Sequence, residues 1–354
     1  MVQSAIPLTG NVANAFRTLG LLYMRSEQRV SRGAPRVVLR TRDADGWHDT
    51  PAWRFFRHVI RVGLFLRERC KMQPGDRVVV LSPLRAERII AEWAVVAQGG
   101  VVATLDPGTP DDVLTRAFEH LSPRVAFVAD GATRDRVRRL GARVERLVQI
   151  EGVPPPDSQD MSWSAMMDLG GTLDTAERAQ AFRSAARSVR PEMPAIAYMD
   201  LQSPGAPEWK TASHAAVVDR LVDLWKSSPA RPGDVAYAVD PGEYAGLRLA
   251  LWGLIADGET TLALGTPERE AFEIAEIRPN VLVGPVESLQ RAAQPSYMLR
   301  QAEASSRVVQ WLRLLTSRAA PRPRPEGAPA PPRSLTLEGS RWPLTSPFAQ
   351  EVAQ

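Results

Sequence analysis

Residues 72–110 read MQPGDRVVVLSPLRAERIIAEWAVVAQGGVVATLDPGTP, and this stretch decides the fold. Pro74-Gly75-Asp76 is a turn signal, and the run 77–81 that follows it is apolar without interruption. Such a run is typical of a strand in a parallel sheet that is covered on both faces. Residues 85–97 then predict a helix and residues 101–105 a second strand. Strand, helix and strand in succession predict a right-handed βαβ unit.

The same alternation extends toward the N-terminus. Residues 36–40 predict a short strand, and Thr50-Pro51 predicts a helix start with Thr50 as the N-cap and Pro51 at the first helical position. Apolar residues then recur at spacings of three and four, which predicts one buried helix face. That predicted face consists of Trp53, Phe56, Ile60 and Leu64. We expect Arg54, Arg57 and Arg61 to point outward.

Toward the C-terminus the alternation of strands and helices continues to residue 150, is interrupted, and starts again at residue 194. Helices 110–121 and 133–140 and strands 125–128 and 144–150 complete a first α/β lobe, residues 1–150. Residues 151–193 form a connector with one helix, 175–188. A second α/β lobe, residues 194–318, is predicted from strands 195–199, 234–239, 260–264 and 280–283 and helices 213–225, 245–256, 268–276 and 298–317. Residues 319–354 form a proline-rich tail that we expect to be disordered.

Composition narrows the class of protein. The chain has 354 residues, 44% of them apolar and 24% charged, which is typical of a globular protein. The 44 basic residues face 40 acidic residues and form no basic stripe, so we expect no nucleic-acid binding. No apolar run is long enough to cross a membrane. A single cysteine, Cys70, fits a reducing compartment and predicts a cytoplasmic location.

Five motifs between Trp47 and Asp130 resemble, in their order and spacing, the adenylate-forming acyl-CoA synthetases. They are Trp53-x-x-Phe56, Met72-x-Pro74-Gly75-Asp76-Arg77-Val78, Glu87-x-x-Ile90-Ala91-Glu92-x-Ala94, Gly99-Gly100-Val101 and Asp106-Pro107-x-Thr109-Pro110. Gly284-Pro285-Val286-Glu287-x-Leu289, the segment 298–306 and Val309-x-Trp311 resemble the long-chain fatty acyl-CoA synthetases in particular. The resemblance covers roughly residues 15–318. It implies two stacked, doubly wound, mainly parallel α/β lobes, like the N-terminal domain of these enzymes and incomplete at the C-terminal end.

The resemblance also implies a phosphate-binding loop, which in the family reads Tyr-Thr-Ser-Gly-Thr-Thr-Gly-x-Pro-Lys-Gly and is followed by Ser-His. The matching stretch here is Tyr198-Met-Asp-Leu-Gln-Ser-Pro-Gly-Ala-Pro-Glu-Trp-Lys-Thr-Ala-Ser213-His214. Gly205, Pro207 and Ser213-His214 match the pattern. The nucleotide-binding candidates that this match gives are Tyr198, Ser203, Gly205, Lys210 and His214.

The front of this loop departs from the family pattern. Asp200 and Leu201 replace the serine and the first glycine, Pro204 is inserted before Gly205, and Glu208 stands where the lysine belongs. A proline removes an N–H donor, a leucine disfavours left-handed backbone, and carboxylates repel a triphosphate. Lys210 and Ser203 are the nearby groups that could compensate. Simpler roles are a turn for Gly205, a surface pair for Glu208 and Lys210, and a helix N-cap for Ser213.

A second family element, Pro-x-x-His-x-x-Gly, lines the acyl pocket in relatives. The matching run is Asp240-Pro-Gly-Glu243-Tyr-Ala-Gly246, with Glu243 at the histidine position. The substrate-binding candidates are therefore Glu243 and Gly246, although a plain polar loop is equally expected there. The family's later motifs for adenine, ribose and the catalytic lysine have no counterpart after Ala293. His48, His58 and His120 show no metal-ligand spacing, so we expect no metal site.

These residues lead to one functional hypothesis and two alternatives. The first is a catalytically degenerate relative of the acyl-CoA synthetases, with no catalytic residue and no certain cofactor. It would bind a protein partner, or an acyl, acyl-CoA or nucleotide ligand, with peripheral membrane contact left open. The second is an active long-chain fatty acid–CoA ligase that uses ATP and Mg, either alone or completed by another chain. The third is a structural scaffold, and the tail run Pro321-Arg-Pro-Arg-Pro325 is a docking motif or a spacer.

Overall fold

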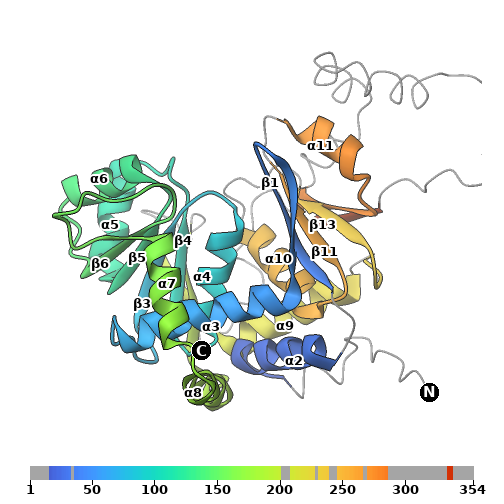
Figure 1. Ribbon diagram of the computed structural model, residues 1–354, viewed down its shortest axis with the longest axis horizontal. Coiled ribbons are helices and arrows are strands. Elements are labelled where there is room, and N and C mark those ends of the chain that lie inside the picture. The colour runs from blue at the N-terminus through green and yellow to red at the C-terminus, as the bar shows by residue number, and fades with distance from the viewer. Residues whose placement is uncertain are drawn as a thin grey trace, which may run out of the picture. The chain divides into compact units, whose positions relative to one another are not determined.

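The computed structural model describes residues 16–32, 36–200, 208–227, 230–238, 245–265, 269–285 and 333–337. These residues fall into two compact units (Figure 1). Unit 1 takes its described residues from Met1–Arg36 and Pro51–Lys226, and unit 2 from Val37–Thr50 and Ser227–Trp342. The predicted lobe boundaries at residues 150 and 193 differ from this division. Strands that follow residue 193 pair with the first sheet, whereas residues 37–50 pair with the second.

Unit 1 contains a seven-stranded sheet of order β7-β6-β5-β3-β4-β8-β9. All neighbours are parallel except β8 and β9, which are antiparallel. Its strands are β3 (Arg77–Leu81), β4 (Val101–Leu105), β5 (Val125–Val128), β6 (Arg146–Gln149), β7 (Met161–Ser162), β8 (Pro194–Asp200) and β9 (Glu208–Ser213). Its helices are α2 (Leu19–Arg32), α3 (Ala52–Glu68), α4 (Ala86–Val96), α5 (Asp111–Leu121), α6 (Gly131–Arg139), α7 (Trp163–Leu173), α8 (Ala176–Ser188) and α9 (His214–Ser227).

Unit 2 contains a six-stranded sheet of order β13-β12-β10-β11-β1-β2. The pairs from β13 to β1 are parallel. Its strands are β1 (Val37–Asp43), β2 (Gly46–Pro51), β10 (Val235–Ala238), β11 (Thr261–Leu264), β12 (Val281–Pro285) and β13 (Arg333–Leu337). Its helices are α10 (Ala245–Asp257) and α11 (Glu270–Ile277). The mixed α/β class and the mainly parallel sheets are confirmed.

The core of unit 1 forms where helices cover the apolar strands. Val79 and Leu81 of β3 are fully buried, and they pack with Phe118 of α5 and Leu147 of β6. Each side chain of this kind contributes about 1.5–3 kcal/mol when it is fully buried. This packing explains why the uninterrupted apolar run 77–81 was a reliable strand signal.

Three predictions near the N-terminus and in the tail are wrong. Pro51, not Thr50, is the N-cap of α3, because β2 continues through Thr50. Trp53 is 57% exposed, since Phe55 and Phe56 occupy the buried face of α3. In the tail, residues 333–337 form β13 and pair with β12, so disorder is not a property of the whole tail. The predicted helix 298–317 lies outside the described residues.

No helix within the described parts of the chain has the length and hydropathy needed to cross a bilayer.

Candidate functional site

The hairpin of β8 and β9 carries the candidate phosphate loop. The two strands are antiparallel, and the loop between them, residues 201–207, lies outside the described residues. Ser203 and Gly205 belong to that loop, so their placement is not described. Tyr198 and Lys210 are direct partners across the hairpin. The register therefore pairs these two candidates, each three positions from the loop.

The strand residues at the mouth of the loop are both acidic. Asp200 ends β8, Glu208 begins β9, and the register makes them direct partners. Residues directly opposite each other in an antiparallel pair have Cβ atoms about 4.5–5.5 Å apart, and like charges at such positions are unfavourable. The register therefore pairs the two acidic residues that the sequence placed on either side of the loop.

Trp209, the neighbour of Lys210, fixes the start of β9. Its side chain packs against the core cluster around Val79 and Ala197. Its ring lies 6.2 Å from the exposed His120 ring, centroid to centroid, with an interplanar angle of 15°. A large aromatic therefore stands where the family loop has its last glycine.

His214 lies at the start of α9, directly after the hairpin, and is fully buried. Its Nδ1 accepts a hydrogen bond from the backbone N–H of Leu19 at 3.3 Å. Burial lowers the pKa of His214 to about 4, so the imidazole is neutral at pH 7. Within the described part of the chain its Nε2 has no hydrogen-bond partner.

The side chain of Ser213 caps helix α9. Its Oγ accepts a hydrogen bond from the backbone N–H of Ala216 at 3.2 Å. This is the N-cap contact that the sequence predicted as the simpler role of Ser213. The Ser-His pair thus has a structural function in this chain. Ser213 caps α9, and His214 accepts a hydrogen bond from Leu19, the first residue of α2.

The substrate-binding candidates belong to unit 2. Glu243 lies outside the described residues, and Gly246 is the second residue of α10. The helix follows β10, whose neighbours in the sheet are β11 on one side and β12 on the other. The strand order reverses at β10, and ligands of doubly wound sheets bind beyond the carboxyl end of a strand at such a point. Gly246 is therefore near the position where a ligand crevice is expected.

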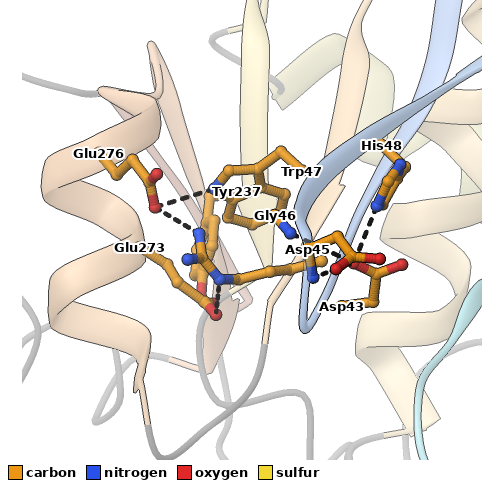
Figure 2. A network of polar contacts seen from close by, with 9 residues as sticks. Asp43, Asp45, Gly46, Trp47, His48, Tyr237, Glu273 and Glu276 are labelled. Atoms are coloured by element: carbon orange, nitrogen blue, oxygen red, sulfur yellow. Dashed lines mark hydrogen bonds and ion pairs between the residues drawn. The ribbon is translucent and has the colours of Figure 1, made fainter.

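A polar network in unit 2 was not predicted from the sequence (Figure 2). Tyr237 of β10 donates a hydrogen bond through its hydroxyl to Glu273 Oε2 at 2.8 Å, and Trp47 Nε1 donates to Glu276 Oε2 at 3.1 Å. Arg42 forms ion pairs with both glutamates, and its Nε lies 3.7 Å from Glu273 Oε1. These residues lie far apart in the chain, and the only sequence signal for them is the recurrence of glutamate every three residues in α11.

Arg42 is also held between two aromatic rings. Its Cζ lies 5.5 Å from the ring centroid of Trp47 and 5.5 Å from that of Phe272. Cation–π contacts of this geometry contribute about 0.5–2 kcal/mol each. The network therefore fixes the β1–β2 hairpin against α11 within unit 2.

Metal and thiol chemistry have no support among the described residues. No group of three or more histidine, cysteine or carboxylate side chains within the described ranges could hold a metal ion. Cys70 is buried, and burial raises the pKa of its thiol to about 11. At pH 7 the thiol is protonated and is a poor nucleophile.

The two mainly parallel sheets and the β8–β9 hairpin make this an α/β protein whose fold is similar to the N-terminal domain of adenylate-forming enzymes. The sequence profile of the family described as AMP-binding enzyme matches residues 53–326. The chain belongs to this family. No curated protein sequence matches it.

Solved structures show the same fold. A luciferase-like enzyme from the mealworm Zophobas morio has a TM-score of 0.61 and 14% identity, over 79% of this chain and 63% of that one. A putative long-chain-fatty-acid CoA ligase from Rhodopseudomonas palustris has a TM-score of 0.58 and 18% identity, over 79% and 67%. A fatty acyl-adenylate ligase from L. pneumophila has a TM-score of 0.54 and 13% identity, over 77% and 45%. The chain thus spans less than two thirds of the luciferase-like enzyme and under half of the adenylate ligase.

Proposed function

We propose that this member of the AMP-binding family does not form an acyl adenylate by itself. It acts as a binding module for a protein partner, or for an acyl or nucleotide ligand. The observation that carries the proposal is the register of β8 with β9, which makes Asp200 and Glu208 direct partners at the mouth of the candidate phosphate loop.

Charge explains why this pair argues against adenylation. Two like charges 4 Å apart repel by about 1 kcal/mol in water and about 4 kcal/mol near a protein surface. ATP carries several negative charges, and two carboxylates stand on the strands that lead to the loop. Family loops place a lysine and backbone N–H groups there, which attract phosphates. The residues that flank this loop therefore do not fit a triphosphate.

His214 and Ser213 support the same proposal. His214 is neutral and accepts the Leu19 N–H, and Ser213 caps α9. Neither residue offers a positive charge to a phosphate. Lys210 is the one lysine in the hairpin, two positions beyond Glu208, and it is the residue on which residual ATP binding would depend.

The first experiment measures pyrophosphate release and ATP binding by the full chain. We expect no pyrophosphate from ATP, magnesium, coenzyme A and a fatty acid, and no heat of ATP binding in calorimetry, with or without magnesium. Pyrophosphate release that is lost in Lys210→Ala would contradict the proposal and establish the active-ligase alternative.

The second experiment restores the family charges. The double variant Asp200→Ser/Glu208→Lys removes two negative charges and adds one positive charge at the loop. We expect it to bind ATP at least tenfold more tightly than the wild type. Glu119→Lys/Glu177→Ser, at exposed positions of α5 and α8, changes the net charge by the same three units; it is the matched control, and we expect no gain from it. An equal gain in both variants would show that net charge, not the loop, limits ATP binding.

The third experiment separates the binding roles. A rise in melting temperature with a fatty acid, an acyl-CoA or AMP would identify a small-molecule ligand. Without any such shift, a protein-binding role or a structural scaffold remains.

A further inference from the structure

The outer face of α3 carries an exposed stripe. Trp53, Arg57 and Arg61 follow one another at spacings of four, and Arg54 lies three residues before Arg57, so the four lie on one side of the helix. Trp53 is 57% exposed, and the Arg57 and Arg61 side chains are 48% and 35% exposed. The opposite side of α3 is buried in unit 1 through Phe55, Phe56 and their apolar neighbours, while α3 runs across the front of the unit in Figure 1.

A buried carboxylate orients two of these arginines. Asp174, whose side chain is 1% exposed, is the C-cap residue of α7. Its Oδ2 accepts from Arg57 Nε and, at 3.3 Å, from Arg61 Nε. Within the described part of the chain, the terminal Nη groups of both arginines have no hydrogen-bond partner. Asp174 thus holds each guanidinium by its inner nitrogen and leaves the outer nitrogens for a ligand.

The close approach of α7 supports this arrangement. A Cβ on Gly170 would lie 2.6 Å from the Arg61 carbonyl oxygen, so only glycine allows the two helices to come this near. The Arg61 guanidinium lies close to Gly171, the residue after Gly170. A Cβ on Gly171 would be 3.7 Å from Arg61 Cζ. The Arg61 guanidinium therefore packs against Gly171 and is also paired with Asp174.

The end of the stripe is aromatic. The Arg54 guanidinium lies 5.5 Å from the Trp53 ring centroid. Arg61 and Arg54 also contribute, after burial, to the lowered pKa of His58 on the same helix, which reflects a positive local field. Tryptophan and arginine are the residue types most enriched among those that dominate protein–protein binding energy.

We propose that the stripe Trp53, Arg54, Arg57 and Arg61 is the docking surface for a protein partner that presents surface carboxylates beside an apolar residue. The proposal rests on the binding-module role proposed above. Arginine pairs carboxylates through two parallel N–H···O bonds, and the free Nη groups of Arg57 and Arg61 are placed for such contacts. The Trp53 ring supplies the apolar contact at the edge of the charged pair.

An anionic membrane fits this surface less well than a protein does. Each basic residue near an anionic bilayer adds only modestly to membrane binding, so stable attachment needs several of them. Arg57 and Arg61 share the negative charge of Asp174, so the stripe has a net charge of about two. The apolar side of α3 is already buried in the core and cannot insert into lipid. A protein interface instead excludes water around the pairs, which strengthens them.

The test begins with a photo-crosslinking residue at Thr172, an exposed position of α7 next to Gly171, in the full chain expressed in its own cells. The same residue at Glu119 of α5 is the control. The protein captured at Thr172 alone is then purified, and its Kd is measured with the wild type and with variants. Capture alone does not support the proposal, and the Kd values carry that conclusion.

The variants separate charge, geometry and the aromatic contact. Trp53→Ala and the triple variant Arg57→Ala/Arg61→Ala/Asp174→Asn, which leaves no buried charge unpaired, should each weaken Kd at least tenfold. Arg57→Lys/Arg61→Lys keeps the charge but loses the paired N–H donors, and we expect an intermediate loss. Arg139→Ala and Val153→Ala, at exposed positions of unit 1, should change Kd less than twofold. Melting curves confirm that each variant is folded.

Three results would overturn the proposal: no protein captured at Thr172, a Kd that Trp53→Ala and the arginine variants leave within twofold of the wild type, or a captured partner without surface carboxylates. Cosedimentation with vesicles of phosphatidylserine and phosphatidylcholine at 3:7 that requires Arg57 and Arg61 would replace the protein partner by a membrane. Pyrophosphate release by the wild type would contradict the proposed function and leave the Kd result standing, so the two failures are distinguishable.

Discussion

His214 makes the stability of unit 1 depend on pH. The pKa of its imidazole is about 4 in the folded chain and about 6.5 when exposed, so the unfolded chain binds more protons between these values. The stabilisation is complete above pH 6.5 and is lost as the pH falls through 4. A difference of about 2.5 pKa units corresponds to about 3 kcal/mol. We expect urea unfolding of the wild type to show this loss between pH 7 and pH 4.

Two substitutions isolate that effect. His214→Gln keeps an acceptor for the Leu19 N–H but does not titrate, so its unfolding free energy should depend on pH by about 3 kcal/mol less than that of the wild type. His120→Gln, at an exposed position of α5, should retain the wild-type dependence. An unchanged slope in His214→Gln would mean that carboxylates alone cause the acid sensitivity.

The polar network of unit 2 packs closely against Gly265, which has no side chain. A Cβ at this position would lie 1.8 Å from Glu273 Oε2 and 2.2 Å from the Tyr237 hydroxyl. Gly265→Ala should therefore separate the hydrogen-bonded pair and lower the unfolding free energy by about 2–4 kcal/mol. Gly131→Ala, where the nearest atom would be 3.7 Å away, should cost less than 1 kcal/mol. Equal melting temperatures for the two variants would contradict the tight packing around Glu273.

At the scale of elements, α7 depends on a pair of adjacent glycines that differ in their surroundings. Gly170→Ala would place a Cβ 2.6 Å from the Arg61 carbonyl oxygen and should force α3 and α7 apart, at a cost of about 1–3 kcal/mol. Gly171→Ala meets nothing closer than 3.7 Å and should be neutral or stabilise the helix by up to about 1 kcal/mol. Chemical denaturation of the two variants checks the difference, and equal effects would place the close contact elsewhere.

The elements that the sequence predicted are those whose own pattern is strong. The apolar run of β3 and the amphipathic repeat of α3 need no tertiary context to be recognised. The strands β2 (GWHDTP) and β9 (EWKTAS) have mixed polar composition, and they form because β1 and β8 offer a partner edge. The helix α7 was missed because two glycines weaken its helix signal, while close packing on α3 requires one of them.

Only the local features of the candidate site could be predicted from the sequence. The N-cap at Ser213 and the acidic residues at 200 and 208 are visible in the sequence itself. Their pairing in the hairpin could be known only from the strand register. The orientation of Arg57 and Arg61 could be known only from the contact with Asp174, which lies 113 residues beyond Arg61. Trp53 followed the helical repeat but lies outside the buried face, because a repeat locates a face only to within one residue.

At the scale of the whole molecule, the second sheet joins distant parts of the chain. The Thr261 hydroxyl donates a hydrogen bond to the Val37 carbonyl across 224 residues, and β13 closes the other edge of the sheet from near the C-terminus. Pairings of this kind carry a large loop-closure cost, so neighbouring strands must repay it through burial. No local pattern in residues 37–50 or 333–337 reveals such partners.

The role of β13 gives a prediction for the whole chain. β13 pairs in parallel with all of β12, from Val281 with Arg333 to Pro285 with Leu337. A chain that ends at Pro332 would leave the backbone groups on that edge of β12 to water, and amides that bond to β13 should exchange at least tenfold faster. A chain that ends at Trp342 keeps β13 and is the matched control. Amides of Val78 to Leu81 in β3 should be unaffected in both chains, because β3 belongs to unit 1. Equal protection of β12 in the two truncated chains would show that β13 does not complete the sheet in solution.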